Sequence, residues 1–216
     1  MTDVWSQRAD AFRESATHRE GPDLDLLVEW CEPARDVKVL DVATGGGHVA
    51  RRLREEGATV ITVDRAPGMR PDVVSTAEEL PFADGAFDVV TCRIAAHHFP
   101  DIRRAIAEMA RVTQGLVVIE DNVFVGEDVE AAERLRDPTH VRCYSEDEWK
   151  EMLTEAGLEV EQLMHFERRT NVGEWLARVD TPPEDARRVR ELLAERIDDG
   201  LLTLDTIVVS ARKSQK

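Results

Sequence analysis

The feature that most constrains this chain is a glycine loop that joins a short apolar segment to a helix. Residues 37–42 are apolar and bounded by charge, as a buried parallel strand should be, and they lead into Gly45-Gly46-Gly47. The spacing of apolar residues after the loop predicts a helix, which ends at Gly57. A strand that enters a helix through a glycine turn favours an α/β fold built on a parallel sheet.

The same alternation of strands and helices continues to the end of the chain. Apolar runs predict further strands over residues 58–63, 72–75 (weakly), 87–92, 116–120, 158–166 and 204–211. Helical spacing predicts helices over residues 102–109, from the capping box at Ser145 to Gly157, and from Val189 to Ile197. This order predicts a doubly wound sheet covered by helices on both faces.

The first 36 residues lie outside this alternation. Residues 4–12 and 24–30 have the spacing of amphipathic helices. These helices either form a lid over a site or pack on the sheet, and the sequence leaves both possibilities open. Trp5 and Phe12 would line an apolar pocket in the first case and join the core in the second.

Composition bounds the function. The chain of 216 residues is 42% hydrophobic, enough for one domain with a full core, and its formal net charge is -16. Such acidity argues against nucleic acid or anionic lipid as a partner. No apolar stretch approaches the roughly 20 residues of a membrane span. The three cysteines have no CxxC spacing, so we expect a cytoplasmic protein with free thiols and without a metal site.

Two acidic residues indicate the ligand of the glycine loop. Asp41 lies in the first strand, beside the helix start that would bind an anion, so a ligand that carries both an amine and a carboxylate would suit this position. Asp64 ends the second strand, 23 residues later, where an acid can accept both hydroxyls of a ribose. An amino acid joined to a nucleoside describes S-adenosylmethionine.

A second interpretation of the loop is a dinucleotide site. Residues 45–50 also match the G-x-G-x-x-A fingerprint of a nicotinamide-dependent oxidoreductase. Asp41 argues against it, because its charge would repel a pyrophosphate. A Tyr-x-x-x-Lys pair is also lacking, since the only tyrosine, Tyr144, is followed four residues later by Glu148.

Further motifs carry a resemblance to a known family. The segment AEELPFADGAFDVV at residues 77–90 resembles class I S-adenosylmethionine-dependent methyltransferases, in particular the group that includes the ubiquinone and menaquinone biosynthesis enzymes. VLDVATGGG at residues 39–47, AHHF at 96–99 and EMARV at 108–112 are similar to the same group. The resemblance covers residues 37–121 well. Beyond it, RDPTHVR at residues 136–142 resembles a small-molecule subgroup.

The resemblance implies a Rossmann-like sheet of seven strands, with an antiparallel last strand and an N-terminal helical lid. One methyltransferase domain would then span residues 1–216. Within it, residues 1–36 form the lid, 37–121 bind the cofactor, and 122–216 hold a substrate-side insertion and the C-terminal strands. The expected cofactor residues are Asp41, Ala43, Thr44, Gly45, Gly47, Asp64, Arg65, Met69, Thr76, Ala77, Glu78 and Cys92.

Three positions depart from the family pattern. Ala43 replaces the first glycine of the loop, and Thr76 replaces an Asp that usually binds the adenine amino group. The segment from Asp64 to Ala77 is short, so the helix that normally follows the second strand is expected to be mostly missing. The adenine side of the site would therefore be more open.

The implied reaction is methyl transfer to O, N or C of a small organic acceptor. Alignment of the acceptor with the methyl group contributes most of the rate, and a base is needed only if the acceptor must lose a proton. The candidate bases are His98, His97 and His140, with the expectation that His97 and His98, being adjacent, do not both face the substrate. A cofactor-binding protein without catalysis is a further alternative. We expect a monomer or homodimer.

Overall fold

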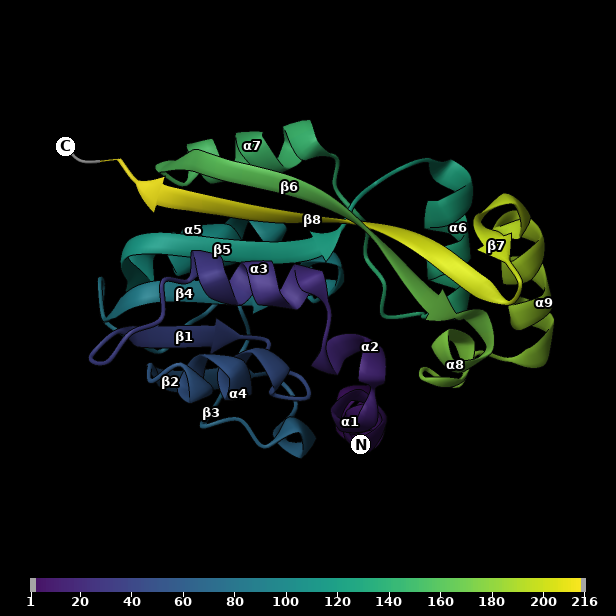
Figure 1. Ribbon diagram of the computed structural model, residues 1–216, viewed down its shortest axis with the longest axis horizontal. Helices are drawn as coiled ribbons and strands as arrows, with labels where there is room; N and C mark the ends of the chain where they lie inside the picture. The colour runs from purple at the N-terminus through teal and green to yellow at the C-terminus, as the bar shows by residue number, and fades with distance from the viewer. Residues whose placement is uncertain (1–2, 215–216) are drawn as a thin grey trace.

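The fold, described by a computed structural model over residues 3–214, is a mixed sheet between helical layers (Figure 1). Its strands follow the order β3-β2-β1-β4-β5-β8-β6, and the short β7 pairs with β8 alone. Strands β1 to β5 are parallel, whereas β8 is antiparallel to both β5 and β6. The strands are β1 Lys38–Val42, β2 Thr59–Asp64, β3 Val73–Val74, β4 Phe87–Arg93, β5 Thr113–Asn122, β6 Leu158–Asn171, β7 Ile197–Asp198 and β8 Leu201–Lys213. The doubly wound Rossmann-like fold with an antiparallel last strand is therefore confirmed.

The α-helices are α1 Val4–Glu14, α2 Ala16–Arg19, α3 Pro22–Trp30, α4 His48–Glu55, α5 Ile102–Val112, α6 Glu127–Arg136, α7 Glu146–Glu155, α8 Val172–Ala177 and α9 Pro183–Leu192. Three short 3-10 helices are η1 Pro67–Met69, η2 Ala96–His98 and η3 Ala194–Arg196. The capping box that opens α7 is confirmed, since Ser145 and Glu148 each accept a hydrogen bond from the other's backbone N–H. The predicted helix from Val189 to Ile197 is too long: α9 ends at Leu192, and Ile197 begins β7.

Alternate residues of the central strands enter two separate cores. Val39 packs in a cluster with residues of α3 and α4, and its neighbour Leu40 packs in another with residues of α5 and α7. Both side chains are fully buried. This alternation follows from the pleat of a strand, which sends successive side chains to opposite faces. It explains why the central strands read as continuous apolar runs.

Strands β6 and β8 extend beyond the parallel part of the sheet as a long twisted ribbon (Figure 1). Their pairing continues to Asn171 opposite Leu201, past the predicted ends of both strands. A third apolar cluster, with Trp175 of α8 and Val189 of α9 at its centre, covers this end of the ribbon. No helix within residues 3–214 has the length and apolar character that a membrane crossing requires.

The N-terminal helices divide between the two expected roles. Helix α3 packs on the sheet through Leu24 and Leu27, whereas α1 packs against η1. Gly68 permits the second contact, because a Cβ at this position would lie 2.5 Å from the Cα of Ser6. The segment between β2 and β3 contains η1 but no α-helix, as the short spacing predicted.

Candidate active site

A cavity opens at the carboxyl ends of β1, β2 and β4, where ligands of doubly wound sheets bind. It encloses about 1000 Å³, counting its open mouth. Ten of the twelve expected cofactor residues line it: Asp41, Ala43, Thr44, Gly45, Asp64, Arg65, Met69, Thr76, Ala77 and Glu78. Gly47 and Cys92 do not. Cys92 belongs to the apolar core, where burial raises the pKa of its thiol well above the ordinary value. That placement disagrees with the expectation that Cys92 contacts a cofactor.

Alternate residues of the glycine loop have positive φ angles. Ala43, Gly45 and Gly47 have φ values of 54°, 51° and 76°, in the left-handed region that glycine adopts without strain. Ala43 carries a Cβ in this region, so the departure from the family's glycine has a small conformational cost. The Thr44 hydroxyl donates to an Asp41 carboxylate oxygen at 2.6 Å. Burial raises the pKa of Asp41 to about 7.

The carboxylate of Asp64 is held by the backbone on both sides. Its two oxygens accept hydrogen bonds from the N–H groups of Gly45 and Ala66, each at 2.9 Å. A carboxylate oxygen has two lone pairs, so each keeps one acceptor position for a further donor. The arrangement fits the two hydroxyls of a ribose. Burial raises the pKa of Asp64 as well.

Residues of α1 and α2 form another wall of the same cavity. Trp5, Phe12 and His18 line it, and the ring of Trp5 meets the ring of His98 edge-on at 4.6 Å. Helix α1 is tied down by Arg8, whose guanidinium lies 3.1 Å from the buried carboxylate of Asp137. The helices expected as a lid therefore contribute cavity walls, while α3 belongs to the sheet.

Arg93 also lines the cavity and was missed in the sequence. Its guanidinium binds the carboxylates of Asp23 and Glu120 and donates to the carbonyl of His18 at 2.9 Å. It thereby attaches the N-terminal helices to the sheet. The sequence does contain a pattern that indicates this ion pair. Arg93 ends one apolar strand, and Glu120, its partner in the sheet register, lies near the end of the next.

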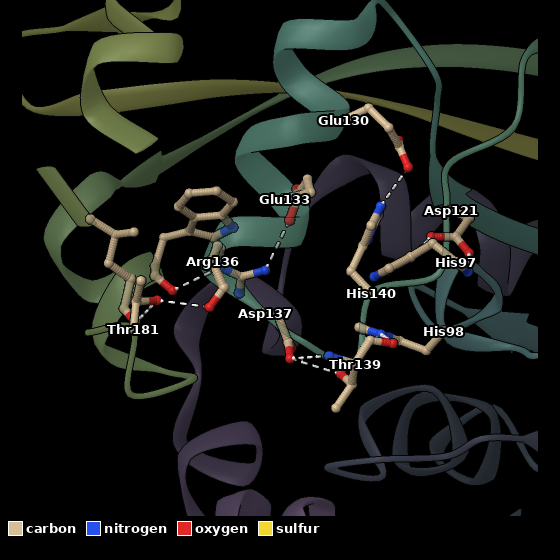
Figure 2. A network of polar contacts seen from close by, with 12 residues as sticks. His97, His98, Asp121, Glu130, Glu133, Arg136, Asp137, Thr139, His140 and Thr181 are labelled. Atoms are coloured by element: carbon tan, nitrogen blue, oxygen red, sulfur yellow. Dashed lines mark hydrogen bonds and ion pairs between the residues drawn. The ribbon is translucent and has the colours of Figure 1, made fainter. Parts of the chain in front are cut away.

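His98 is the histidine that borders the cavity. It also lines a smaller second cavity, so it lies at the border of both. Its Nδ1 lies 3.0 Å from the backbone carbonyl of Thr139, close to Asp137 in the network of Figure 2. A carbonyl only accepts, so Nδ1 carries the hydrogen and Nε2 keeps a free lone pair. Burial, followed by the charge of His97, holds the pKa of His98 well below its usual value.

His97 has a different environment. Its ring nitrogen Nδ1 and its backbone N–H both bind the carboxylate of Asp121. Burial opposes the charged form, but the Asp121 carboxylate outweighs it and raises the pKa of His97. The rings of His97 and His98 lie 4.1 Å apart, and both line the second cavity. The two adjacent rings share this cavity because they lie in the 3-10 turn η2 and not in a strand, and the expectation that they do not both face the substrate stays a prediction.

His140 lies on neither cavity. Its Nε2 is 3.0 Å from a carboxylate oxygen of Glu130, and the other oxygen of Glu130 accepts the backbone N–H of Cys143 at 3.2 Å. Ligand-type atoms of these three residues lie within 4.8 Å of one another. The hydrogen bonds already account for both Glu130 oxygens, and the expectation of no metal site stays a prediction.

Comparison with known proteins places the chain in a family. A family model described as "Methyltransferase domain" matches residues 9–163. The uncharacterised methyltransferase YcgJ of Bacillus subtilis is 32% identical over 91% of this chain and 86% of its own length. The crystal structure of YcgJ superposes with a TM-score of 0.81, covering 90% of this chain and 99% of that one.

A shorter match reaches the quinone-related enzymes of the suspected group. The demethylmenaquinone methyltransferase of Renibacterium salmoninarum is 37% identical over 41% of this chain and 42% of its own length. This match does not decide between subgroups. The motifs, the sheet order and the full-length relatives agree on the family and disfavour the nicotinamide interpretation. The chain belongs to the class I S-adenosylmethionine-dependent methyltransferases.

Proposed function

We propose that this enzyme transfers a methyl group from S-adenosylmethionine to a small organic acceptor. The observation that carries the proposal is the cavity at the carboxyl ends of β1, β2 and β4, around which Asp41, Asp64 and the glycine loop converge. When bound there, the cofactor supplies an activated methyl group on a sulfonium. Asp64 accepts the ribose hydroxyls, and Asp41 balances the amino group of the methionine portion.

The adenine side of the site is built from Ser75, Thr76 and Ala77. A threonine at position 76 offers one hydroxyl where a carboxylate would be a stronger acceptor for the adenine amino group. We therefore expect much of the adenine affinity to come from contact with apolar neighbours such as Met69. The ribose and methionine portions provide the polar recognition.

His98 is the base best placed to assist transfer. Its lowered pKa keeps it neutral near pH 7, and the residue borders both cavities. A bound cofactor would supply the methyl group to a lone pair of the acceptor atom. A proton on the acceptor atom passes to Nε2 of His98. His97 and His140 are committed to Asp121 and Glu130, so we propose that they position neighbours.

Calorimetric titration with S-adenosylhomocysteine tests cofactor binding. The wild-type protein should bind it, and Asp64→Asn should bind it more weakly, because a neutral amide replaces a charged acceptor of two hydroxyls, each worth about 1.5–3 kcal/mol. A wild-type protein that fails to bind it contradicts the proposed function. An unchanged affinity in Asp64→Asn would show only that the ribose lies elsewhere.

A screen with labelled S-adenosylmethionine and a metabolite extract would identify the acceptor through the mass of the product. With that acceptor, His98→Ala should lower kcat by about 100-fold or more, as expected for loss of a general base. His165→Ala is the matched control, because the side chain of His165 on β6 is half-exposed and pairs with Glu146 of α7. Equal turnover of wild type and His98→Ala would exclude His98 as a base.

A further inference from the structure

The second cavity lies beside the proposed cofactor site. The two cavities share Phe12, His18, Ile94 and His98 as lining residues. The second encloses about 540 Å³ when its open mouth is counted. Its other walls come from β5, α6, β6 and α8. A molecule bound here lies next to His98, which also borders the proposed cofactor site.

Four arginines line this second cavity, although the whole chain is strongly acidic. Three of them have carboxylate partners, with N–O distances of 3.1 Å for Arg136–Glu133, 3.3 Å for Arg168–Asp23 and 3.4 Å for Arg169–Asp198. Arg178 differs: among residues 3–214, its guanidinium has no carboxylate oxygen within 4.0 Å. It donates one hydrogen bond, to the hydroxyl of Thr17 at 3.0 Å.

Moving an unpaired guanidinium away from bulk water costs free energy, and this cost lowers the pKa of the group. Burial, followed by the charges of Arg136 and Arg168, lowers the pKa of Arg178 to about 10. The group is still a cation at pH 7. Glu174, the nearest acid along α8, is exposed and beyond salt-bridge distance.

The other titratable groups around the cavity are balanced or neutral. Asp137 is paired with Arg8, and His97 is paired with Asp121. His18 and His98 have pKa values held well below the ordinary value, chiefly by burial, so both are neutral near pH 7. Among the arginines that line this cavity, Arg178 is therefore the one without a carboxylate partner in the described residues.

We propose that the methyl acceptor is a small organic monocarboxylate that binds in the second cavity with its carboxylate on Arg178. This inference rests on the proposed function and names the class of its substrate. One carboxylate balances the one unpaired cation, whereas a phosphate dianion would leave a negative charge uncompensated. A hydroxyl or amino group of the same molecule presents its lone pair beside His98, which borders both cavities.

The test measures the binding of a probe molecule and does not require catalytic turnover. Benzoate is titrated into the protein in the presence of saturating S-adenosylhomocysteine, with benzamide as its neutral counterpart. Wild type should bind benzoate at least tenfold more tightly than benzamide, and Arg178→Gln should raise the benzoate Kd at least tenfold. Arg187→Gln removes one charge from an exposed position on α9 and should stay within twofold of wild type.

Several outcomes would overturn the inference. These are equal affinity for benzoate and benzamide, an unchanged benzoate Kd in Arg178→Gln, and inorganic phosphate binding at Arg178 more tightly than benzoate. If Arg178→Gln does not fold, Arg178→Lys replaces it. A folded lysine variant should keep the preference for benzoate, and loss of that preference overturns charge pairing at this position.

Failure of the proposed function would look different from failure of this inference. S-adenosylhomocysteine should bind Arg178→Gln and wild type within twofold of each other, because Arg178 does not line the first cavity. A wild type that binds no S-adenosylhomocysteine contradicts the methyltransferase proposal, and benzoate can then be titrated into the protein alone. A wild type that binds S-adenosylhomocysteine but shows no preference for benzoate refutes only the acceptor class.

Discussion

The buried carboxylate of Asp41 should make cofactor affinity depend on pH near neutrality. Its pKa is raised to about 7 by burial, so about half of the free protein carries a protonated Asp41 at pH 7. A protonated carboxyl does not pair with the ammonium of the ligand. Binding therefore requires ionisation, and affinity is lost as pH falls through the raised pKa.

The magnitude follows from that pKa. The apparent Kd scales with 1 + 10^(pKa − pH), which gives factors of about 1.3 at pH 7.5 and about 11 at pH 6. S-adenosylhomocysteine should thus bind about eightfold more weakly at pH 6 than at pH 7.5, or about 1.2 kcal/mol. The histidines His18, His48 and His98 around the cavity have lowered pKa values and contribute little over this range.

Calorimetry at four pH values between 6 and 7.5 measures this slope. Asp41→Asn should bind more weakly at pH 7.5 and should lose the pH dependence, because an amide does not titrate. Asp64→Asn is the matched control, since it also weakens binding but leaves Asp41 in place and should keep the slope. A flat wild-type profile, or the same slope in Asp41→Asn, would refute the assignment of the titrating group to Asp41.

Three further predictions concern the elements around the site. Gly68→Ala should weaken S-adenosylhomocysteine binding measured by calorimetry, because the new Cβ would push α1 away from η1. Gly115→Ala is the control, since a Cβ at that position meets open space and should leave binding unchanged. Arg8→Ala should lower the free energy of unfolding by about 3 kcal/mol in urea at pH 7. The loss should shrink as the pH falls below 3.8 and through the pKa of Asp137, which is lowered in the folded protein. Trp149→Ala should cost about 3–5 kcal/mol in the same assay, because its side chain is fully buried, and half-buried Trp30→Ala should cost less.

The central sheet was predictable because its signals are local. A buried strand needs a short apolar run, and the loop after β1 needs glycines where the backbone turns left-handed, so both are visible in adjacent residues. The end of α9 was not predictable in the same way. Ile197 continues the helical spacing of Val189 and Leu193, but pairing with Leu202 of β8 draws it into β7. Pairing in a tight hairpin therefore overrides the helical spacing of the apolar residues.

The candidate cofactor site followed largely from position in the chain, and its errors came from side-chain direction. Cys92 lies in β4 between Thr91 and Arg93, and the strand's alternation sends it into the core while Arg93 faces the cavity. Residues near each other in sequence need not face the same space. The histidine pair shows the reverse case, because a 3-10 turn brings both rings to one cavity.

The second cavity was beyond prediction because it is assembled from distant segments. Arg136, Arg168 and Arg178 come from α6, β6 and the end of α8, and each is unremarkable among the many arginines of the chain. Their convergence depends on the long β6–β8 ribbon, which extends past its predicted ends and carries α8 back toward α6. Phe166, Arg168 and Thr170 do alternate along β6, but only the register of that strand shows which face they share.

The acidity of the chain and the charge of this cavity act at different distances. A net charge of -16 is spread over the surface, where salt screens each charge beyond about 8–10 Å, so it governs which large partners can approach. A buried guanidinium is screened much less and acts on whatever small molecule reaches it. The same protein can therefore repel nucleic acid and still select a small anion, and composition excludes the first without limiting the second.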